Sequence, residues 1–190
     1  MVHPVRRLAL LLVLLSSGAA RAGIDLTPRP SVYLAEGVKM PNLSFTDGKN
    51  EIAYTPPPDW KCEGDSSRLL LLPRNRVQAE ASIEKTPPPI TAVFDEAGAK
   101  KLTDTVVASL PRGSRKVAVL SQEKNPLRIN GKETYEVVVS SVFFGQAVTT
   151  SAVFCTRGKE QLVFRLFCHS ADFPELARAF RRSLYSFQGF

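Results

Sequence analysis

His169 is the one histidine that follows residue 22, so acid–base or metal chemistry in the main part of the chain would depend on it. A single imidazole excludes a multi-histidine metal site, and it would have to serve alone in any Ser-His-Asp or Cys-His arrangement. Cys168 precedes it directly, but adjacent residues of a strand point to opposite faces. We therefore expect His169 at the surface near a helix start, and a hydrolase built around His169 is kept as an alternative hypothesis.

The short motifs that carry well-known chemistry are absent from the sequence. It has no G-x-S-x-G, H-E-x-x-H or C-x-x-C motif, no phosphate-binding loop and no dinucleotide-binding fingerprint. The acid pairs Glu63/Asp65 and Asp95/Glu96 lack the spacing of a calcium loop. These observations predict a protein that is not an enzyme, with no catalytic residues, no cofactor and no metal.

Three arginines near the C-terminus, Arg178, Arg181 and Arg182, form a compact basic set on a predicted helix. One interpretation is a face for an anionic partner such as a membrane surface, a polyanion or an acidic protein. The other is that cations near a helix C-terminus favour the helix dipole and solvate its outer face. Either way, we expect the three side chains to point away from the core.

Five phenylalanines could line a ligand pocket, although their period-two spacing is more typical of a core. They are Phe143, Phe144, Phe154, Phe164 and Phe167.

Cys62, Cys155 and Cys168 are the only cysteines, and an odd number leaves at least one thiol unpaired within a monomer. Cys155 and Cys168 lie on two strands joined by a tight turn, about six residues out of register. That offset separates them by roughly 20 Å at strand rise, whereas a disulfide needs Cα atoms within about 7 Å. A bond from Cys62 to either one stays open, as does the alternative of three small buried side chains.

Residues 1–22 have the three parts of a secretory signal peptide: a basic start, the apolar run LALLLVLL, and a small-residue end at Ala20-Arg21-Ala22. Cleavage is expected after Ala22, which gives a secreted or periplasmic protein. Removing this peptide lowers the formal net charge from +7 to +4, a value that argues against nucleic acid as partner. No later run is long and apolar enough to span a membrane.

The first half of the remaining chain alternates short strands with proline-rich turns. Residues 23–42 carry three prolines and are predicted to be an extended leader or linker, followed by one domain over 43–190. A hairpin is expected around Asp47-Gly48, and Trp60 is expected to fold back onto the core. The run RLLLLP at 68–73 is predicted to be buried on both faces, and residues 77–85 alternate. Their inward residues would be Val77, Ala79, Ala81 and Ile83.

Two helices and a β-meander account for the rest. The first helix is expected over 95–110, with Asp95 as its N-cap and an apolar stripe through Ala99, Leu102, Val106 and Leu110. Asn130-Gly131 and Gly145-Gln146 are predicted turns. The C-terminal helix is expected over 172–187, with a capping box of Asp172 and Glu175. The meander strands are expected at 115–123, 133–144, 147–156 and 161–169, which gives an α+β class.

The chain resembles the PsbP-like superfamily over about residues 43–187. Three segments carry the resemblance: YTPPPDW at 54–60, INGKETYE at 129–136 and FRRSLYSF at 180–187. The resemblance implies an α/β/α sandwich, with a central antiparallel sheet between helices. It also implies a binding or assembly role rather than catalysis, and no functional residue carries over from it.

The leading hypothesis is therefore an exported, non-catalytic module that binds a protein or an envelope component of unknown identity. A carrier of a small apolar ligand, held between the sheet and a helix, is the first alternative.

Overall fold

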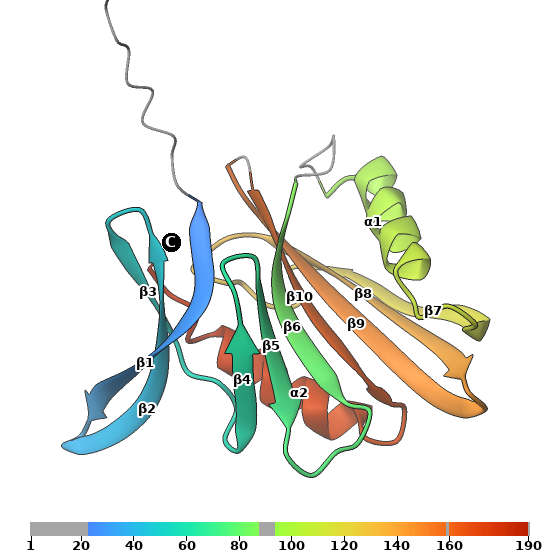
Figure 1. The fold of residues 1–190 in the computed structure, drawn as a ribbon. Helices are drawn as coiled ribbons and strands as arrows, with labels where there is room; N and C mark the ends of the chain where they lie inside the picture. Colours follow the sequence, from blue (N-terminus) through green and yellow to red (C-terminus); the bar gives the residue numbers. More distant parts are fainter. Residues whose placement is uncertain (1–22, 88–93, 159, 190) are drawn as a thin grey trace, which may run out of the picture.

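The computed structural model describes residues 23–87, 94–158 and 160–189, and it is an α+β fold of two antiparallel sheets and two helices (Figure 1). The predicted signal peptide lies outside the described residues. The small sheet has the order β1-β2-β3, and the large sheet has the order β4-β5-β6-β10-β9-β8-β7. The strands of the small sheet are β1 (Ile24–Ala35), β2 (Val38–Asp47) and β3 (Asn50–Tyr54).

The large sheet lies between the two helices, which confirms the predicted sandwich (Figure 1). Helix α1 spans Glu96–Ala108 and α2 spans Phe173–Leu184. The first three strands of the large sheet are β4 (Trp60–Gly64), β5 (Arg68–Pro73) and β6 (Glu80–Thr86). The other four are β7 (Arg115–Lys124), β8 (Thr134–Phe143), β9 (Gln146–Arg157) and β10 (Glu160–His169).

The prediction that residues 23–42 form a leader is wrong, because they make β1 and the first half of β2. Ile24 and Leu26 have no exposed surface and belong to the main core. Pro28 and Pro30 misled the prediction, but β1 is the edge strand of its sheet, and an edge strand tolerates residues that cannot donate to a ladder. The folded unit therefore begins about twenty residues earlier than expected.

Strand β10 divides the core into two parts by its alternation. Leu162, Phe164, Leu166 and Cys168 point to the face covered by α2, here called the α2 face, and all belong to the larger cluster. Val163 points to the opposite face, here called the α1 face, where it packs with Leu102 and Val106 of α1. The predicted stripe of α1 is thus confirmed.

Two segments of the family resemblance contact each other directly. Ser183 and Tyr54 share a hydrogen bond of 2.9 Å between their hydroxyls, and the Thr55 N–H donates to the Ser186 hydroxyl at 2.7 Å. The Phe187 ring packs on Tyr54 at 5.8 Å, and Trp60 stacks on Phe180 at 6.2 Å, as expected. These contacts hold β3 of the small sheet and β4 of the large sheet against the C-terminal segment.

The two helix starts differ from each other. The Asp95 carboxylate accepts from the Gly98 N–H, so the predicted N-cap is confirmed. Asp172 makes no side-chain cap, so the predicted capping box is wrong. Arg76 explains the difference, because its guanidinium lies 3.4 Å from Asp172 and 3.0 Å from Glu175. Both acids are used to hold the β5–β6 turn against α2.

Three further predictions need correction, two of them near β5 and β6 and one at the β8–β9 turn. In β5, Leu69 and Leu71 are buried, but Leu70 and Leu72 on the α1 face are only half-buried. Val77 is 83% exposed, because it lies in the turn before β6 begins. The β8–β9 turn lies at Phe144-Gly145, one residue earlier than predicted, whereas the predicted Asn130-Gly131 turn is confirmed.

Neither helix of the described residues has the length and apolar character that a membrane span requires.

Candidate functional site

The α1 face of the large sheet is only partly covered. Helix α1 packs over the β7–β8 side of that face, as Figure 1 shows. Among the described residues no helix covers the part formed by β5, β6, β10 and the β8–β9 hairpin, because α1 packs on β7 and β8. A hollow of about 460 Å³ lies there, within the range of about 300–1,000 Å³ typical of ligand sites.

We call this region the Arg165 hollow. Its apolar wall consists of Leu72, Ala79, Pro111, Phe143, Phe144 and Phe167. Its polar groups come from Gln78, Glu80, Ser109, Thr150 and Arg165. Apolar walls with a few convergent polar groups are the usual composition of a small-molecule site.

Arg165 makes no ion pair with a described residue in this hollow. Its Nε is buried and has no hydrogen-bond partner among the described residues. The acids nearest to it on β6 contact Arg68 instead, which lies 3.1 Å from Glu84 and 3.7 Å from Glu80. Arg165 pairs in register with Ser82, whose hydroxyl instead donates to Glu84 at 2.6 Å. The guanidinium is therefore left available for an anion from outside.

Thr150 supplies a second unpaired group on the adjacent strand. Its side chain is 3% exposed, yet Oγ1 has no hydrogen-bond partner in the described part of the chain. Thr150 lies opposite Phe167 of β10 in the register and therefore on the same face as Arg165. A buried hydroxyl without a partner costs about 1–3 kcal/mol, which a bound ligand can recover.

The aromatic wall stands at the tip of the β8–β9 hairpin. Phe143 meets Phe167 edge to face at 6.4 Å and lies 4.4 Å from the Phe144 ring. Phe144 is 86% exposed and has a φ of 46°, a left-handed conformation that a bulky residue adopts rarely. Of the five phenylalanines considered in the sequence, these three line the hollow, whereas Phe154 and Phe164 are core residues.

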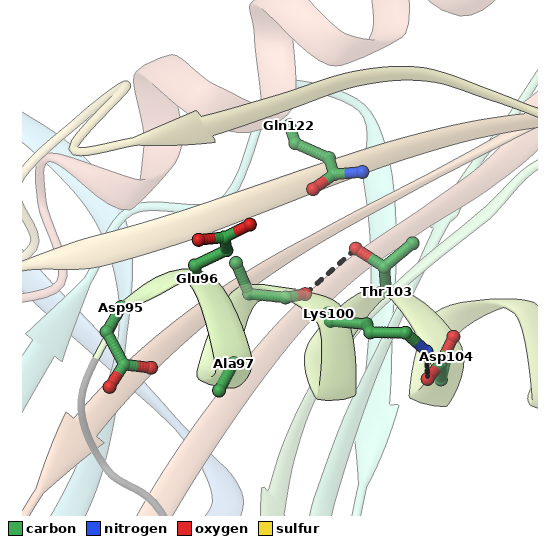
Figure 2. A pocket seen from close by; sticks show the side chains of 8 residues that line it. Asp95, Glu96, Ala97, Lys100, Thr103, Asp104 and Gln122 are labelled. Carbon is green, nitrogen blue, oxygen red and sulfur yellow. Dashed lines mark hydrogen bonds and ion pairs between the residues drawn. The ribbon is translucent and has the colours of Figure 1, made fainter.

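A second hollow, of about 660 Å³, lies between the start of α1 and β7, but its polar groups other than Glu96 are already paired (Figure 2). Lys100 lies 3.0 Å from Asp104, and the Thr103 hydroxyl donates to the Ala99 carbonyl at 3.0 Å. Asp95 is occupied as the N-cap, and Gln122 accepts from the Tyr135 hydroxyl at 3.1 Å. With these groups satisfied internally, we assign the candidate site to the Arg165 hollow instead.

The three predicted arginines do not form one free basic face. Arg178 and Arg182 are exposed, but Arg181 donates at 2.5 Å to Glu136, a carboxylate that is only 2% exposed. Glu136 also accepts from the Ser151 hydroxyl at 2.6 Å. The prediction that all three side chains point away from the core is therefore wrong for Arg181, since a buried acid on the α2 face needs its charge.

His169 stands alone at the end of β10. Cys168 is fully buried on the α2 face, and the half-buried His169 follows it on the opposite face, so the two diverge as predicted. No acid or nucleophile makes a side-chain hydrogen bond to His169 among the described residues, and no group of three metal-ligating side chains occurs in them.

The cysteines are all free thiols. Cys155 and Cys168 are buried, and Cys62 is partly buried. Burial raises the pKa of Cys62 and of Cys155 to about 11 and the pKa of Cys168 to about 12. Such thiols are almost entirely protonated near neutral pH and therefore unreactive.

Arg165 is not among the site residues that the sequence predicted. The signal was present, since Arg165 is a charge between Val163 and Phe167 on a face that otherwise reads as apolar. What the sequence could not show is that Arg68 occupies the nearby acids, because those pairs depend on the β5–β6–β10 register.

Comparison with known proteins gives the fold. No protein-family model matches the chain, and no curated protein matches it in sequence. Among solved structures, CyanoP, the cyanobacterial PsbP of Synechocystis sp. PCC 6803, matches with a TM-score of 0.51 at 15% identity, over 91% of this chain and 96% of that one. A protein of unknown function from Pseudomonas aeruginosa matches with a TM-score of 0.49 at 14% identity, over 83% of this chain and 94% of that one. A Mog1 mutant matches with a TM-score of 0.48 at 11% identity, over 84% and 90%. The likeness to CyanoP covers most of the chain, and the fold is therefore PsbP-like, as the sequence segments predicted.

Proposed function

We propose that this protein is an exported, non-catalytic binding module whose ligand occupies the Arg165 hollow. The observation that carries the proposal is the combination, in one hollow, of an apolar wall with two buried polar atoms that have no partner among the described residues. Buried polar atoms of this kind are normally satisfied by a bound water, an ion or a ligand. No nucleophile and base pair accompanies them, which supports binding rather than turnover.

Two measurements test this function. Native mass spectrometry of protein freshly isolated from its own host should show added mass that denaturation removes. A neutral apolar dye, N-phenyl-naphthylamine, should bind saturably, and Phe144→Ser should weaken that binding several-fold because the wall loses an aromatic face. Val77→Ser is the matched control, since Val77 is equally exposed but lies outside the hollow. An unliganded mass together with the absence of saturable dye binding would contradict the proposed function.

Export rests on the signal-like residues 1–22. We expect the protein, expressed in its host, to appear outside the cytoplasm with Gly23 as its first residue. N-terminal sequencing of the fractionated protein checks this. An intact Met1 on cytoplasmic protein would contradict it.

A second candidate function is attachment to a protein partner, which the leading sequence hypothesis also named. The far end of the β1–β2 hairpin carries apolar side chains in solvent: Val32, Tyr33, Leu34, Val38 and Met40. Leu34 and Val38 are 70% and 60% exposed, and clustered exposure of this kind is typical of interaction surfaces. Figure 1 shows this end of the hairpin extending away from the large sheet.

A pulldown from an envelope fraction separates this candidate from the first. Leu34→Asp should abolish capture of a specific partner, and Val77→Asp should leave it unchanged. Equal capture by both variants would exclude the hairpin as the attachment surface.

A further inference from the structure

We propose that the ligand of the Arg165 hollow is an organic carboxylate with an apolar, preferably aromatic, body. This inference rests on the proposed function and names the chemical class of its ligand.

The head of the ligand is set by Arg165. A guanidinium presents its N–H groups as a planar fork that matches the two oxygens of a carboxylate. Neither neighbouring acid makes an ion pair with it, because Glu80 and Glu84 both contact Arg68 instead. An electrically neutral ligand would leave this cation as it is, unpaired and with its Nε buried.

Thr150 adds a hydrogen bond beside the fork. Thr150 lies opposite Phe167 on the neighbouring strand, and Arg165 lies two residues before Phe167 on β10. The side chains of Thr150 and Arg165 therefore point to the same side of the sheet. The Thr150 hydroxyl can donate to a carboxylate oxygen, which satisfies a group that now has no partner in the described chain. One cation and one hydroxyl suit a monoanion, whereas a phosphate dianion would ask for more positive charge.

The body of the ligand is set by the aromatic wall. Phe143 packs directly on Phe144 and Phe167, and Phe144, which is 86% exposed, presents ring surface on which an aromatic group can stack. A small inorganic anion would leave these rings in water, and a hydrocarbon would leave Arg165 unpaired. A molecule with one carboxylate and one apolar body satisfies both parts of the hollow.

The test compares naphthylacetic acid with its uncharged amide, which has the same body, by isothermal titration calorimetry on the full mature chain. The acid should bind roughly tenfold more tightly than the amide, a difference typical of a charge-assisted hydrogen bond. In Arg165→Gln the acid should lose this advantage while the amide keeps its affinity. Arg178→Gln, which removes an exposed arginine of α2, should change neither. Naphthyl phosphate is the third arm, and it should bind less tightly than the acid.

Several results would overturn the inference. Equal binding of acid and amide to the unaltered protein would mean that Arg165 does not select an anion, while the hollow would still stand as a binding site. A preference for acid that survives Arg165→Gln would place the anion elsewhere. Tighter binding of the phosphate would change the ligand class. Thr150→Val is a second variant that separates binding from any effect of Arg165→Gln on folding, and it should weaken binding of the acid and leave binding of the amide unchanged. If neither ligand binds while the neutral dye does, the carboxylate inference alone fails.

Discussion

On each face of the large sheet a charged side chain lies among apolar neighbours, and the two side chains differ in their partners. On the α2 face, Glu136 is 2% exposed and is matched by Arg181 of the helix and by the Ser151 hydroxyl. On the α1 face, Arg165 has its Nε buried and no ion-pair partner among the described residues. An unpaired charge is costly in an interior, so the ligand proposed for the Arg165 hollow would supply on the α1 face the counter-charge that Arg181 supplies on the α2 face.

The same contrast runs along β10. Its residues on the α2 face, from Leu162 to Cys168, are at most 1% exposed, whereas Arg165 and Phe167 on the α1 face are half-buried. Helix α2 therefore closes its face and α1 leaves part of its own open. The following predictions test that difference, beginning with the largest effect.

The largest effect is expected from Phe164→Ala compared with Phe167→Ala, two truncations on opposite faces of one strand. Phe164 is fully buried and packs edge to face on Phe187 at 5.6 Å, so its loss leaves a cavity in the closed core. We expect Phe164→Ala to lower the free energy of unfolding by about 3–5 kcal/mol and Phe167→Ala by about 1 kcal/mol. Urea denaturation measures both, and equal losses would mean that the α1 face is as closed as the α2 face.

Loss of the cation on the α2 face should have the next largest effect. Arg181→Ala leaves Glu136 buried without its ion-pair partner, and breaking such a pair costs up to several kcal/mol. The Arg181 side chain is 42% exposed, so solvent screening reduces the expected loss to about 2 kcal/mol. Arg178→Ala is the control and should change the free energy of unfolding by less than about 0.5 kcal/mol. A similar small change for both would show that water stabilises Glu136 as well as Arg181 does.

The pH dependence of stability tests whether the cysteines on the α2 face are buried. Burial raises the pKa of Cys168 to about 12 and that of Cys155 to about 11, from an ordinary value of 9.0. A group whose pKa is higher in the folded state stabilises the fold fully below its unfolded pKa and loses that contribution as the pH rises through its folded pKa. Stability should therefore fall between about pH 9 and pH 12.

Alkylation rates give a matched readout. Iodoacetamide at pH 8 should modify Cys62 first, because it is partly exposed on the edge strand β4, and should modify Cys155 and Cys168 only as the protein unfolds. Peptide mass mapping over time checks the order. Early modification of Cys168 would contradict a closed α2 face.

The sequence predicted the closed face better than the open one, for a physical reason. Period-two and helical patterns identify residues that must be buried, and they located the meander, both helices and the Trp60 contact. They do not report how far a helix covers a sheet, so Leu72 was expected to be buried and Arg165 received no role. The patterns also do not report ion pairs between residues far apart in the sequence. Asp172 and Glu175 pair with Arg76 instead of forming a capping box, and Arg181 pairs with the buried Glu136 instead of pointing to solvent.

The smallest effect, and the sharpest test of the open face, is expected from two Thr→Val substitutions. Thr134 is fully buried and its hydroxyl donates to the Leu127 carbonyl, so Thr134→Val leaves that carbonyl unpaired and should cost about 1–2 kcal/mol. Thr150 is equally buried, but its hydroxyl has no partner among the described residues. Thr150→Val removes a polar group that gains nothing from folding, so the unliganded protein should be unchanged or more stable by about 1 kcal/mol. Thermal and urea unfolding of the two variants measure this difference in stability. A loss for Thr150→Val as large as that for Thr134→Val would mean that the hydroxyl is already satisfied and that the α1 face, like the α2 face, is complete by itself.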